Sequence, residues 1–451
     1  MSEAKPHSED LFVIPRKYGE YYLYAPLRRG LAVVNQATAA TVAAYLKGGK
    51  ASLSPPGQAI IDRLYDAELM GKSAPDPPVY PENCVFYPHE VTLFPTTRCN
   101  LRCRYCYADA GRSALDMPWE IGKAAIDLVA TNAGRAGFRK FGLGFHGGGE
   151  PTVAWEFVTR CVTYAKAKAD ELGLETDLYA ATNAVLSPEQ REFIVDNFST
   201  VNVSLDGPAD IQDYNRPKVG GAGSYDDVSQ SLKFFDKHQF FYGIRTTITA
   251  LTVNRMSEIV EGFMSEFRPG YLHLEPAWFC GRCMITGEQP PEDNVFLENF
   301  MKAFEAGRRL GIDVHYSGAR LDVLTSKFCA APGDGFTVLP EGAVTSCFEV
   351  MDSCDPRAAI FHYGQYDPAK KTMSFDHERL AELRRLSVEN LPFCRDCFCK
   401  WHCAGDCLAK VFARSGSAIH QGSARCGLNR AMTLEQLERL VRQEHAEQAQ
   451  V

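Results

Sequence analysis

Three cysteines in the segment TTRCNLRCRYCYA, residues 96–108, have a spacing that suits an iron–sulfur cluster. Cys99, Cys103 and Cys106 form a C-x3-C-x2-C triplet directly after a predicted strand. Three thiolates on one loop can bind three irons of a cubane, which leaves the fourth iron open to a small molecule. A structural zinc site is the competing interpretation, but such sites normally use four ligands and keep no open position.

A second set of cysteines follows residue 318. Its members form the patterns C-x12-G-x4-C and C-x2-C-x5-C-x3-C, followed by one further cysteine: Cys329, Gly342 and Cys347; Cys394, Cys397, Cys403 and Cys407; Cys426. These spacings predict a metal-stabilised C-terminal unit, and one or two structural zinc sites remain an alternative to iron–sulfur clusters. Of the other cysteines, Cys161 is expected to be a buried core residue, while Cys280 and Cys283 are spaced like metal or redox ligands.

The region between these two sets alternates short β-rich runs with amphipathic segments. The predicted strands are residues 91–96, 141–146, 177–182, 201–205, 244–249 and 271–275, and the helices between them include 119–132, 155–172, 188–197, 225–238 and 256–267. This alternation predicts parallel βα units and a partial barrel. In such a barrel the reactive groups gather at the C-terminal ends of the strands.

Polar and glycine-rich segments follow several of these strands. Gly147–Pro151 (GGGEP) comes after the second strand, Asn183 after the third, Ser204 and Asp206 lie at the end of the fourth, and Arg245 lies in the fifth. Taken singly, such residues are more often turns, helix caps or surface ion pairs. Their order along successive strands predicts a common site.

The cysteine triplet, with Tyr105 before its last cysteine, resembles the signature of the radical S-adenosylmethionine (SAM) superfamily. The resemblance implies that the cluster binds SAM and that reductive cleavage yields methionine and a 5'-deoxyadenosyl radical, which abstracts a hydrogen atom from the substrate. An electron donor of flavodoxin or ferredoxin type is then expected. The cofactor-binding residues that the resemblance implies are Tyr105, Gly148, Gly149, Glu150, Asn183, Ser204 and Arg245.

The C-terminal cysteine pattern resembles the SPASM extension of radical SAM enzymes. That resemblance implies two auxiliary [4Fe-4S] clusters, hence three clusters with the one that binds SAM. Cys329, Cys347 and Cys407 would bind the first auxiliary cluster, and Cys394, Cys397, Cys403 and Cys426 the second.

The first auxiliary cluster would then have only three cysteine ligands. Relatives with a fully ligated cluster usually carry another cysteine about six residues before the first of the three, where this chain has Val323. Two hypotheses follow. Either one iron is open to a substrate thiolate, or a further side chain reaches it, with Cys354, Cys283, Cys280 and Asp322 as candidates.

The fold predicted from these features is α/β: a partial parallel (β/α)6 barrel over residues 84–318, a small N-terminal α+β module over 1–83 and a C-terminal iron–sulfur (SPASM) domain over 319–451. Within the module, residues 21–24 are predicted as strand and 35–45 and 56–69 as helices, and the Pro-rich segment 73–81 as a linker. The module resembles small winged-helix-like domains that bind a peptide by strand addition, and a simple stabilising cap is the alternative.

SPASM enzymes act mostly on ribosomally made peptides or protein side chains, so the resemblance implies a maturase that oxidatively cross-links such a peptide. A sulfatase-type maturase that forms formylglycine is the alternative, although those enzymes typically have an acidic residue directly after the equivalent of Cys347, where this chain has Phe348 and then Glu349. They also lack a long N-terminal extension. Outside this class, a non-catalytic iron–sulfur electron carrier and a zinc-built scaffold remain alternatives.

Composition excludes some partners. The net charge is -8 and the basic residues are scattered, so no nucleic-acid partner is expected. There is neither a signal-peptide pattern nor an apolar run near the ~18 residues that span a bilayer, so the sequence predicts a cytoplasmic protein without membrane contact. Sixteen cysteines in a reducing compartment are expected to act as thiols or metal ligands.

Overall fold

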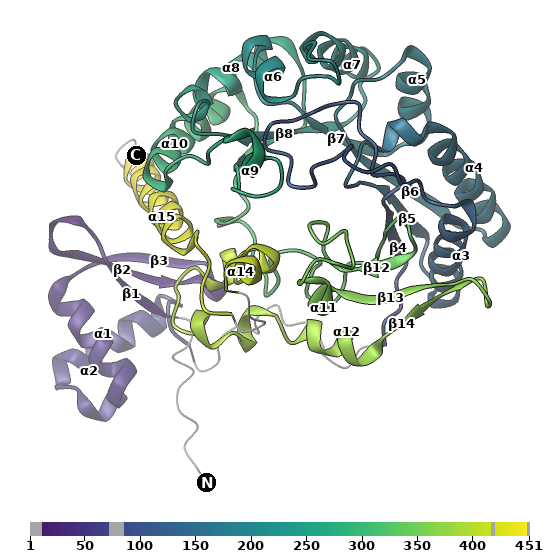
Figure 1. Ribbon diagram of the computed structural model, residues 1–451. Helices are drawn as coiled ribbons and strands as arrows, with labels where there is room; N and C mark the ends of the chain where they lie inside the picture. The colour runs from purple at the N-terminus through teal and green to yellow at the C-terminus, as the bar shows by residue number, and fades with distance from the viewer. Residues whose placement is uncertain (1–10, 72–84, 416–419, 449–451) are drawn as a thin grey trace.

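The computed structural model describes residues 11–71, 85–415 and 420–448. A curved, mostly parallel sheet with helices on its outer face forms most of a ring, and a small unit lies beside the ring at its C-terminal helix (Figure 1). The predicted linker at 73–81 falls outside the described residues, as does Cys84.

The N-terminal unit is a three-stranded antiparallel sheet with two helices. Its elements are β1 (Phe12–Pro15), β2 (Glu20–Ala25), β3 (Gly30–Asn35), α1 (Gln36–Gly48) and α2 (Pro55–Asp66). The sheet order is β1-β2-β3, with β2 in the centre. The sequence predicted the central strand and both helices, but missed the two outer strands. β1 has only four residues, and β3 carries a continuous apolar run instead of an alternation. The helices cover one face of this sheet, where Leu23 packs with Val42 and Ile61.

The opposite face of the small sheet packs on the last helix, α15 (Cys426–Gln448). Tyr22 and Tyr24 contact Leu437 and Val441 there. Arg16 Nε donates a hydrogen bond of 2.8 Å to the Glu438 carboxylate. The N-terminal unit is therefore docked on the C-terminal part of the chain over an apolar surface, with an ion pair beside it.

Six parallel strands form the barrel, as the sequence predicted: β4 (Glu90–Leu93), β5 (Lys140–Phe145), β6 (Glu175–Thr182), β7 (Thr200–Ser204), β8 (Tyr242–Ile248) and β9 (Tyr271–Pro276). The short strand β10 (Val314–His315) pairs with β9 and extends this row. The sequence did not predict β10, because two residues carry no periodic signal.

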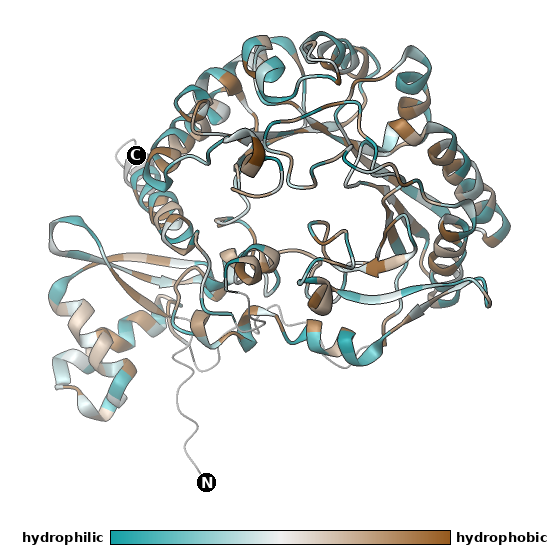
Figure 2. Cartoon of the chain, viewed as in Figure 1, coloured by the Kyte–Doolittle hydropathy of each residue, from teal (hydrophilic) through white to brown (hydrophobic). Residues whose placement is uncertain are grey.

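Amphipathic helices cover the outer face of these strands: α3 (Trp119–Ala136), α4 (Trp155–Leu172), α5 (Pro188–Asn197), α6 (Ala209–Asn215), α7 (Tyr225–Lys237), α8 (Met256–Glu266) and α10 (Asp293–Leu310). Their apolar sides face the sheet and their polar sides face outward (Figure 2). Ile126 and Val129 of α3 and Val162 of α4, for example, belong to one buried cluster with Leu143 of β5. The sheet is thereby held rigidly, which leaves the loops after its strands free to build a site.

The C-terminal unit continues the barrel sheet. Strand β11 (Thr337–Val338) runs parallel to β4, and β12 (Ala343–Thr345), β13 (His362–Asp367) and β14 (Thr372–Phe375) follow as antiparallel neighbours. The remaining helices are short: α9 (Cys283–Thr286), which precedes α10, and then α11 (Ala358–Phe361), α12 (His377–Arg384), α13 (Lys400–Cys403) and α14 (Leu408–Ser415). Within the described ranges, no helix is both long and apolar enough to span a bilayer.

Candidate functional site

The three cysteines of the triplet lie on the loop that leads from β4 to α3. Neighbouring loops hold this loop in place through its backbone: Arg102 N donates to Pro217 O at 2.7 Å, and Arg282 N donates to Cys106 O at 2.9 Å. Burial raises the pKa of the Cys99 thiol to about 11 and that of Cys103 to about 12. Such thiols stay protonated at neutral pH unless a bound metal displaces the proton.

The chemistry of this donor set fits an iron–sulfur cluster. Three soft sulfur ligands on one partly exposed loop suit iron, and each thiolate of a cubane binds a different iron. In the ranges that the structure describes, no three Cys, His, Asp or Glu side chains are placed as the ligands of a single metal ion would be. Ligands of a cubane stand farther apart than those around one ion, so this arrangement is compatible with a cluster.

The glycine-rich segment packs directly on the cysteine loop. Glu150 N donates a hydrogen bond of 2.9 Å to Arg98 O. A Cβ atom on Gly149 would lie 2.2 Å from that same Arg98 oxygen and 2.6 Å from Thr96 O. Glycine is required here because the two backbones touch, and this contact sets the position of the segment relative to the cysteines.

Glu150 ties the glycine-rich segment to the end of β6. The carboxylate is buried and accepts hydrogen bonds of 2.8 Å from the backbone N–H of Asn183 and from the Thr182 hydroxyl. Burial raises its pKa, against the lowering effect of these bonds. Since protein donors occupy both carboxylate oxygens, the side chain of Glu150 positions the segment and leaves its backbone to contact a cofactor.

Tyr105 belongs to a buried polar network that the sequence did not reveal in full. Its hydroxyl donates to the Asp206 carboxylate, which also accepts from Asn215 Nδ2 at 3.1 Å and pairs with Arg216 at 3.1 Å. The Arg216 guanidinium lies 5.2 Å from the centre of the Tyr105 ring. Asn215 and Arg216 carried no recognisable motif, and only the tertiary structure brings them to the cysteine loop. The network anchors Tyr105, and through it the loop, to the end of β7.

The remaining predicted residues lie at neighbouring strand ends. Asn183 Nδ2 donates to Asn100 Oδ1, on the cysteine loop, at 2.7 Å. Ser204 and Arg245 are register partners on β7 and β8. Arg245 is exposed, and its guanidinium has no hydrogen-bond or ion-pair partner within the described part of the chain, while its backbone oxygen accepts from Leu205 N. An unpaired cation at this edge suits a carboxylate of a cofactor or substrate.

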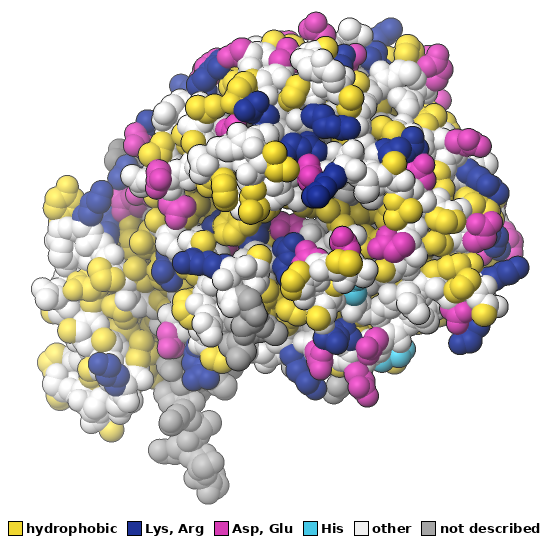
Figure 3. All heavy atoms as spheres, viewed as in Figure 1, with side chains coloured by type: hydrophobic (Ala, Val, Ile, Leu, Met, Phe, Trp, Pro, Cys, Tyr) yellow, Lys and Arg dark blue, Asp and Glu magenta, His cyan; other side chains and the backbone are white. Residues whose placement is uncertain are grey.

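His146, the first residue after β5, also lies at the C-terminal ends of the barrel strands. Burial and the charge of Arg245 lower the pKa of His146 to about 4, so the imidazole is neutral near pH 7. Its ring packs on Phe348 of the C-terminal unit, with 4.5 Å between ring centres. The barrel edge and the C-terminal unit are therefore in contact, and the space-filling view shows a recess near the centre of the molecule (Figure 3).

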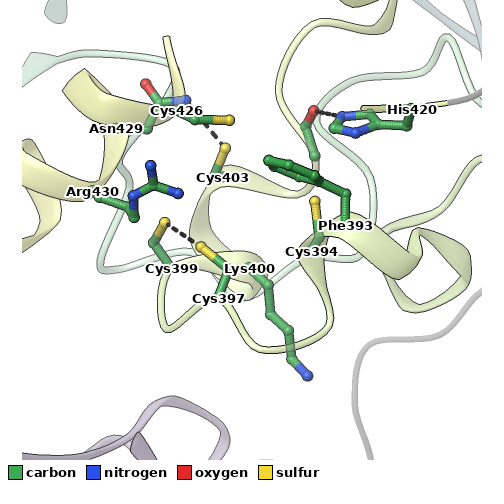
Figure 4. A pocket seen from close by; sticks show the side chains of 11 residues that line it. Phe393, Cys394, Cys397, Cys399, Lys400, Cys403, His420, Cys426, Asn429 and Arg430 are labelled. Atoms are coloured by element: carbon green, nitrogen blue, oxygen red, sulfur yellow. Dashed lines mark hydrogen bonds between the residues drawn. The ribbon is translucent and has the colours of Figure 1, made fainter. Parts of the chain in front are cut away.

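The cysteines predicted for the second auxiliary cluster line one cavity. Cys394, Cys397, Cys403 and Cys426 all face it, together with Cys399, which the sequence did not single out (Figure 4). Cys399 Sγ lies 3.3 Å from Cys397 Sγ. Asn429 Nδ2 donates to Cys403 Sγ at 3.2 Å, and Ser423 N donates to Cys426 Sγ at 3.2 Å. Donors of this kind stabilise thiolates, so the cavity fits a cluster held by four of these five sulfurs.

A buried ion network links this cavity to the barrel. Arg425 pairs with Asp406, which lies between Cys403 and Cys407, and with Glu275 of β9 at 3.1 Å. Glu275 Oε1 in turn lies 2.9 Å from His273 Nε2. Arg425 is the residue before Cys426. The network therefore positions cysteine segments of the C-terminal unit against the last long strand of the barrel.

The remaining cysteines are placed separately. Cys161 is fully buried in the core on α4, as the sequence predicted. Cys283 is buried. Cys280 lies on the loop whose Arg282 donates a backbone hydrogen bond to Cys106 of the triplet. Cys354 is exposed. The sequence offered Cys354, Cys283 and Cys280 only as candidates for a further ligand of the first auxiliary cluster, and it expected no metal role for Cys161.

Comparison with known proteins places this site in context. The Radical SAM superfamily profile matches residues 93–261, from β4 to α8. The cysteine-type anaerobic sulfatase-maturating enzyme of Clostridium perfringens is 24% identical over 344 residues, which are 71% of this chain and 89% of that protein.

Two solved structures share the fold. The structure of anSMEcpe with bound AdoMet and the Kp18Cys peptide has a TM-score of 0.61 at 18% identity and covers 78% of this chain and 99% of that one. Streptococcus suis SuiB bound to its precursor peptide SuiA has a TM-score of 0.52 at 13% identity and covers 93% of this chain and 98% of that one. The SuiB match is the more extensive along this chain.

Proposed function

Because the chain belongs to the radical SAM superfamily, in its SPASM maturase group, we propose that it is an enzyme that oxidatively cross-links a ribosomally made peptide. The family implies SAM and a [4Fe-4S] cluster as cofactors. The observation that carries the proposal is the cysteine loop, which Gly149, Asn183 and the Asp206 network hold at the strand ends, in a chain that carries two further groups of cysteines. The two auxiliary clusters at those groups are part of the proposal.

When bound, the cluster and SAM supply a 5'-deoxyadenosyl radical, which abstracts a hydrogen atom from the substrate. Cys99, Cys103 and Cys106 would hold the cluster. The backbone of Gly148 and Gly149 would contact the cofactor, with Asn183, Ser204 and Arg245 around it. The helix-covered sheet gives these residues a rigid frame, and the recess restricts access of water to the reacting carbon. A flavodoxin or ferredoxin is the electron donor in this proposal.

The N-terminal sheet is the proposed binding site for the substrate peptide. Among the described residues, β3 pairs only with β2, so its outer edge offers unpaired backbone groups. Both faces of β3 are packed: Leu31 and Val33 lie against the α15 side and Ala32 and Val34 against the helices. A packed strand with a free edge can accept an added strand from a peptide. SuiB with its bound precursor peptide supports a peptide as partner.

Two proline substitutions test strand addition at this edge. Successive N–H groups of a strand point to opposite sides. Of the two single variants Ala32→Pro and Val33→Pro, one therefore loses an N–H that points to the free edge, and the other loses an N–H that bonds to β2. The outward variant should keep its unfolding midpoint and lose peptide affinity by about fivefold, since one such bond contributes about 1 kcal/mol. Affinity is measured by titration with the peptide. If the variant that keeps its midpoint also binds the peptide as tightly as wild type, β3 is not the binding edge.

The reaction itself is tested with short peptides encoded beside the gene. Reduced, reconstituted enzyme should convert its peptide to a product lighter by about two hydrogens per bond formed, with one 5'-deoxyadenosine per bond. Mass spectrometry and chromatography measure the two products. The absence of any mass change with every neighbouring peptide, while 5'-deoxyadenosine still forms, would contradict a cross-linking function.

Formylglycine formation is the second candidate, and the relatives that mature sulfatases favour it. In this chain the residue directly after Cys347 is Phe348, whose ring packs on His146 and Phe94, so that position supplies no acid. The same assay with a sulfatase-derived peptide separates the candidates. Conversion of its Cys or Ser to an aldehyde would establish the second function in place of the first.

A further inference from the structure

A carboxylate lies against the cysteines assigned to the first auxiliary cluster. Glu349 follows Cys347 on a turn closed by a 3.1 Å hydrogen bond from Val350 N to Cys347 O. Glu349 Oε1 lies 4.0 Å from Cys407 Sγ. Burial, and to a smaller extent the charge of Glu349, raises the pKa of the Cys329 and Cys347 thiols, so the carboxylate also lies near these two cysteines. Glu349 therefore contacts Cys407 and has Cys329 and Cys347 in its neighbourhood.

The candidates named from the sequence are less well placed. Cys283 lies near Cys106 of the triplet loop, and Asp322 lies near His402. For Cys280 and Cys354, the described part of the structure gives no contact with the sulfurs of Cys329, Cys347 or Cys407. Among the described side chains, Glu349 is the one with a recorded contact to one of these three sulfurs.

The Glu349 carboxylate lies near the cysteines and makes only long contacts with its two neighbouring cations. Lys410 Nζ lies 3.6 Å from Oε1, and Arg357 Nη1 lies 3.8 Å from Oε2, both beyond ordinary hydrogen-bond length. Arg357 makes its shorter contacts with Asp355. The carboxylate therefore lies between two cations, and no strong hydrogen bond must break for it to bind a metal.

We propose that Glu349 is the fourth protein ligand of the first auxiliary cluster, beside Cys329, Cys347 and Cys407. This rests on the proposed function, in that the three cysteines must hold a cluster. Carboxylate oxygen is an accepted iron ligand, and binding it leaves no open iron for a substrate thiolate. The cluster would then transfer electrons without binding the peptide. This replaces the hypothesis that one iron of the first auxiliary cluster is open to a substrate thiolate.

The test uses the full chain in which Cys99, Cys103 and Cys106 are all alanine, so that only auxiliary clusters contribute. Glu349→Gln, Glu349→Cys and the control Glu341→Gln, an exposed acid on the same stretch of chain, are prepared in this background. Iron-57 Mössbauer and electron paramagnetic resonance spectra are recorded with the iron content. The parent should show one iron site with an oxygen ligand. Glu349→Gln should lose about one iron per chain on oxidation and gain a three-iron signal.

Glu349→Cys should restore the iron content and show only sulfur-ligated sites, and Glu341→Gln should match the parent. Identical spectra for the parent and Glu349→Gln would overturn the proposal, as would a Glu349→Cys variant that holds no more iron than Glu349→Gln. Glu349→Gln is also prepared in the chain that keeps Cys99, Cys103 and Cys106, where product formation can be measured. Loss of product there, with auxiliary-cluster spectra unchanged in the triple-alanine background, would also overturn the proposal, since Glu349 would then act on the substrate. A parent with no iron–sulfur signal at all would instead refute the auxiliary clusters themselves.

Discussion

Replacement of Cys99, Cys103 and Cys106 together by alanine is expected to abolish formation of 5'-deoxyadenosine from SAM. Without the three thiolates, no cluster can form on the loop between β4 and α3, so the cofactor is neither bound at iron nor reduced. The protein should lose about four irons per chain and keep those of its C-terminal cysteines. Iron analysis, visible absorption and chromatography of the nucleoside measure these changes.

Cys161→Ala is the matched control, because this thiol lies in the core on α4, away from the loop. It should keep both the iron content and the cleavage activity. Undiminished cleavage of SAM by the triple variant would remove the basis for assigning the loop as the reactive centre.

Gly149→Ala is expected to lower SAM cleavage by about a hundredfold, because displacing a binding segment by about 1 Å has effects of this size. The new Cβ would meet Arg98 O at 2.2 Å and Thr96 O at 2.6 Å, both backbone atoms that no side-chain rotation can move away. The glycine-rich segment must therefore shift relative to the cysteine loop. The rate of 5'-deoxyadenosine formation and the affinity for SAM report the shift.

Gly147→Ala provides a close control for this effect. The nearest atoms to a Cβ at Gly147 lie 3.4 Å away, which is ordinary contact distance, so this variant should cleave SAM at nearly the wild-type rate. Iron content should be unchanged in both variants. Equal rates for Gly147→Ala and Gly149→Ala would show that the contact between the segment and the loop does not position the cofactor.

The arrangement of the three cysteine groups follows from the way the C-terminal unit joins the barrel. Strand β11 continues the sheet beside β4, the strand that leads into the cysteine loop. Arg425 and Glu275 join the C-terminal segments to β9 toward the other end of the row of strands. The C-terminal unit therefore contacts both flanks of the barrel. This dual contact brings Phe348 onto His146 at the strand ends.

The sequence by itself determined the barrel and the cysteine triplet. Strong periodicity identified the six parallel strands and their covering helices, because each long helix must bury an apolar side on the sheet. The spacing of Cys99, Cys103 and Cys106 is local, so it is legible without a fold. The same holds for the glycine-rich segment, whose need for glycine the structure explains by a backbone contact.

Only the tertiary structure decided which distant side chains meet. Arg216 reaches Asp206 and Tyr105, and Glu349 reaches Cys407, through contacts that no short-range pattern records. Likewise, β11 pairs with β4 across more than two hundred residues of chain, and the N-terminal sheet docks on α15. The physical reason is that burial and hydrogen bonding select such partners from the whole folded chain, whereas sequence periodicity reports only on neighbours within one element.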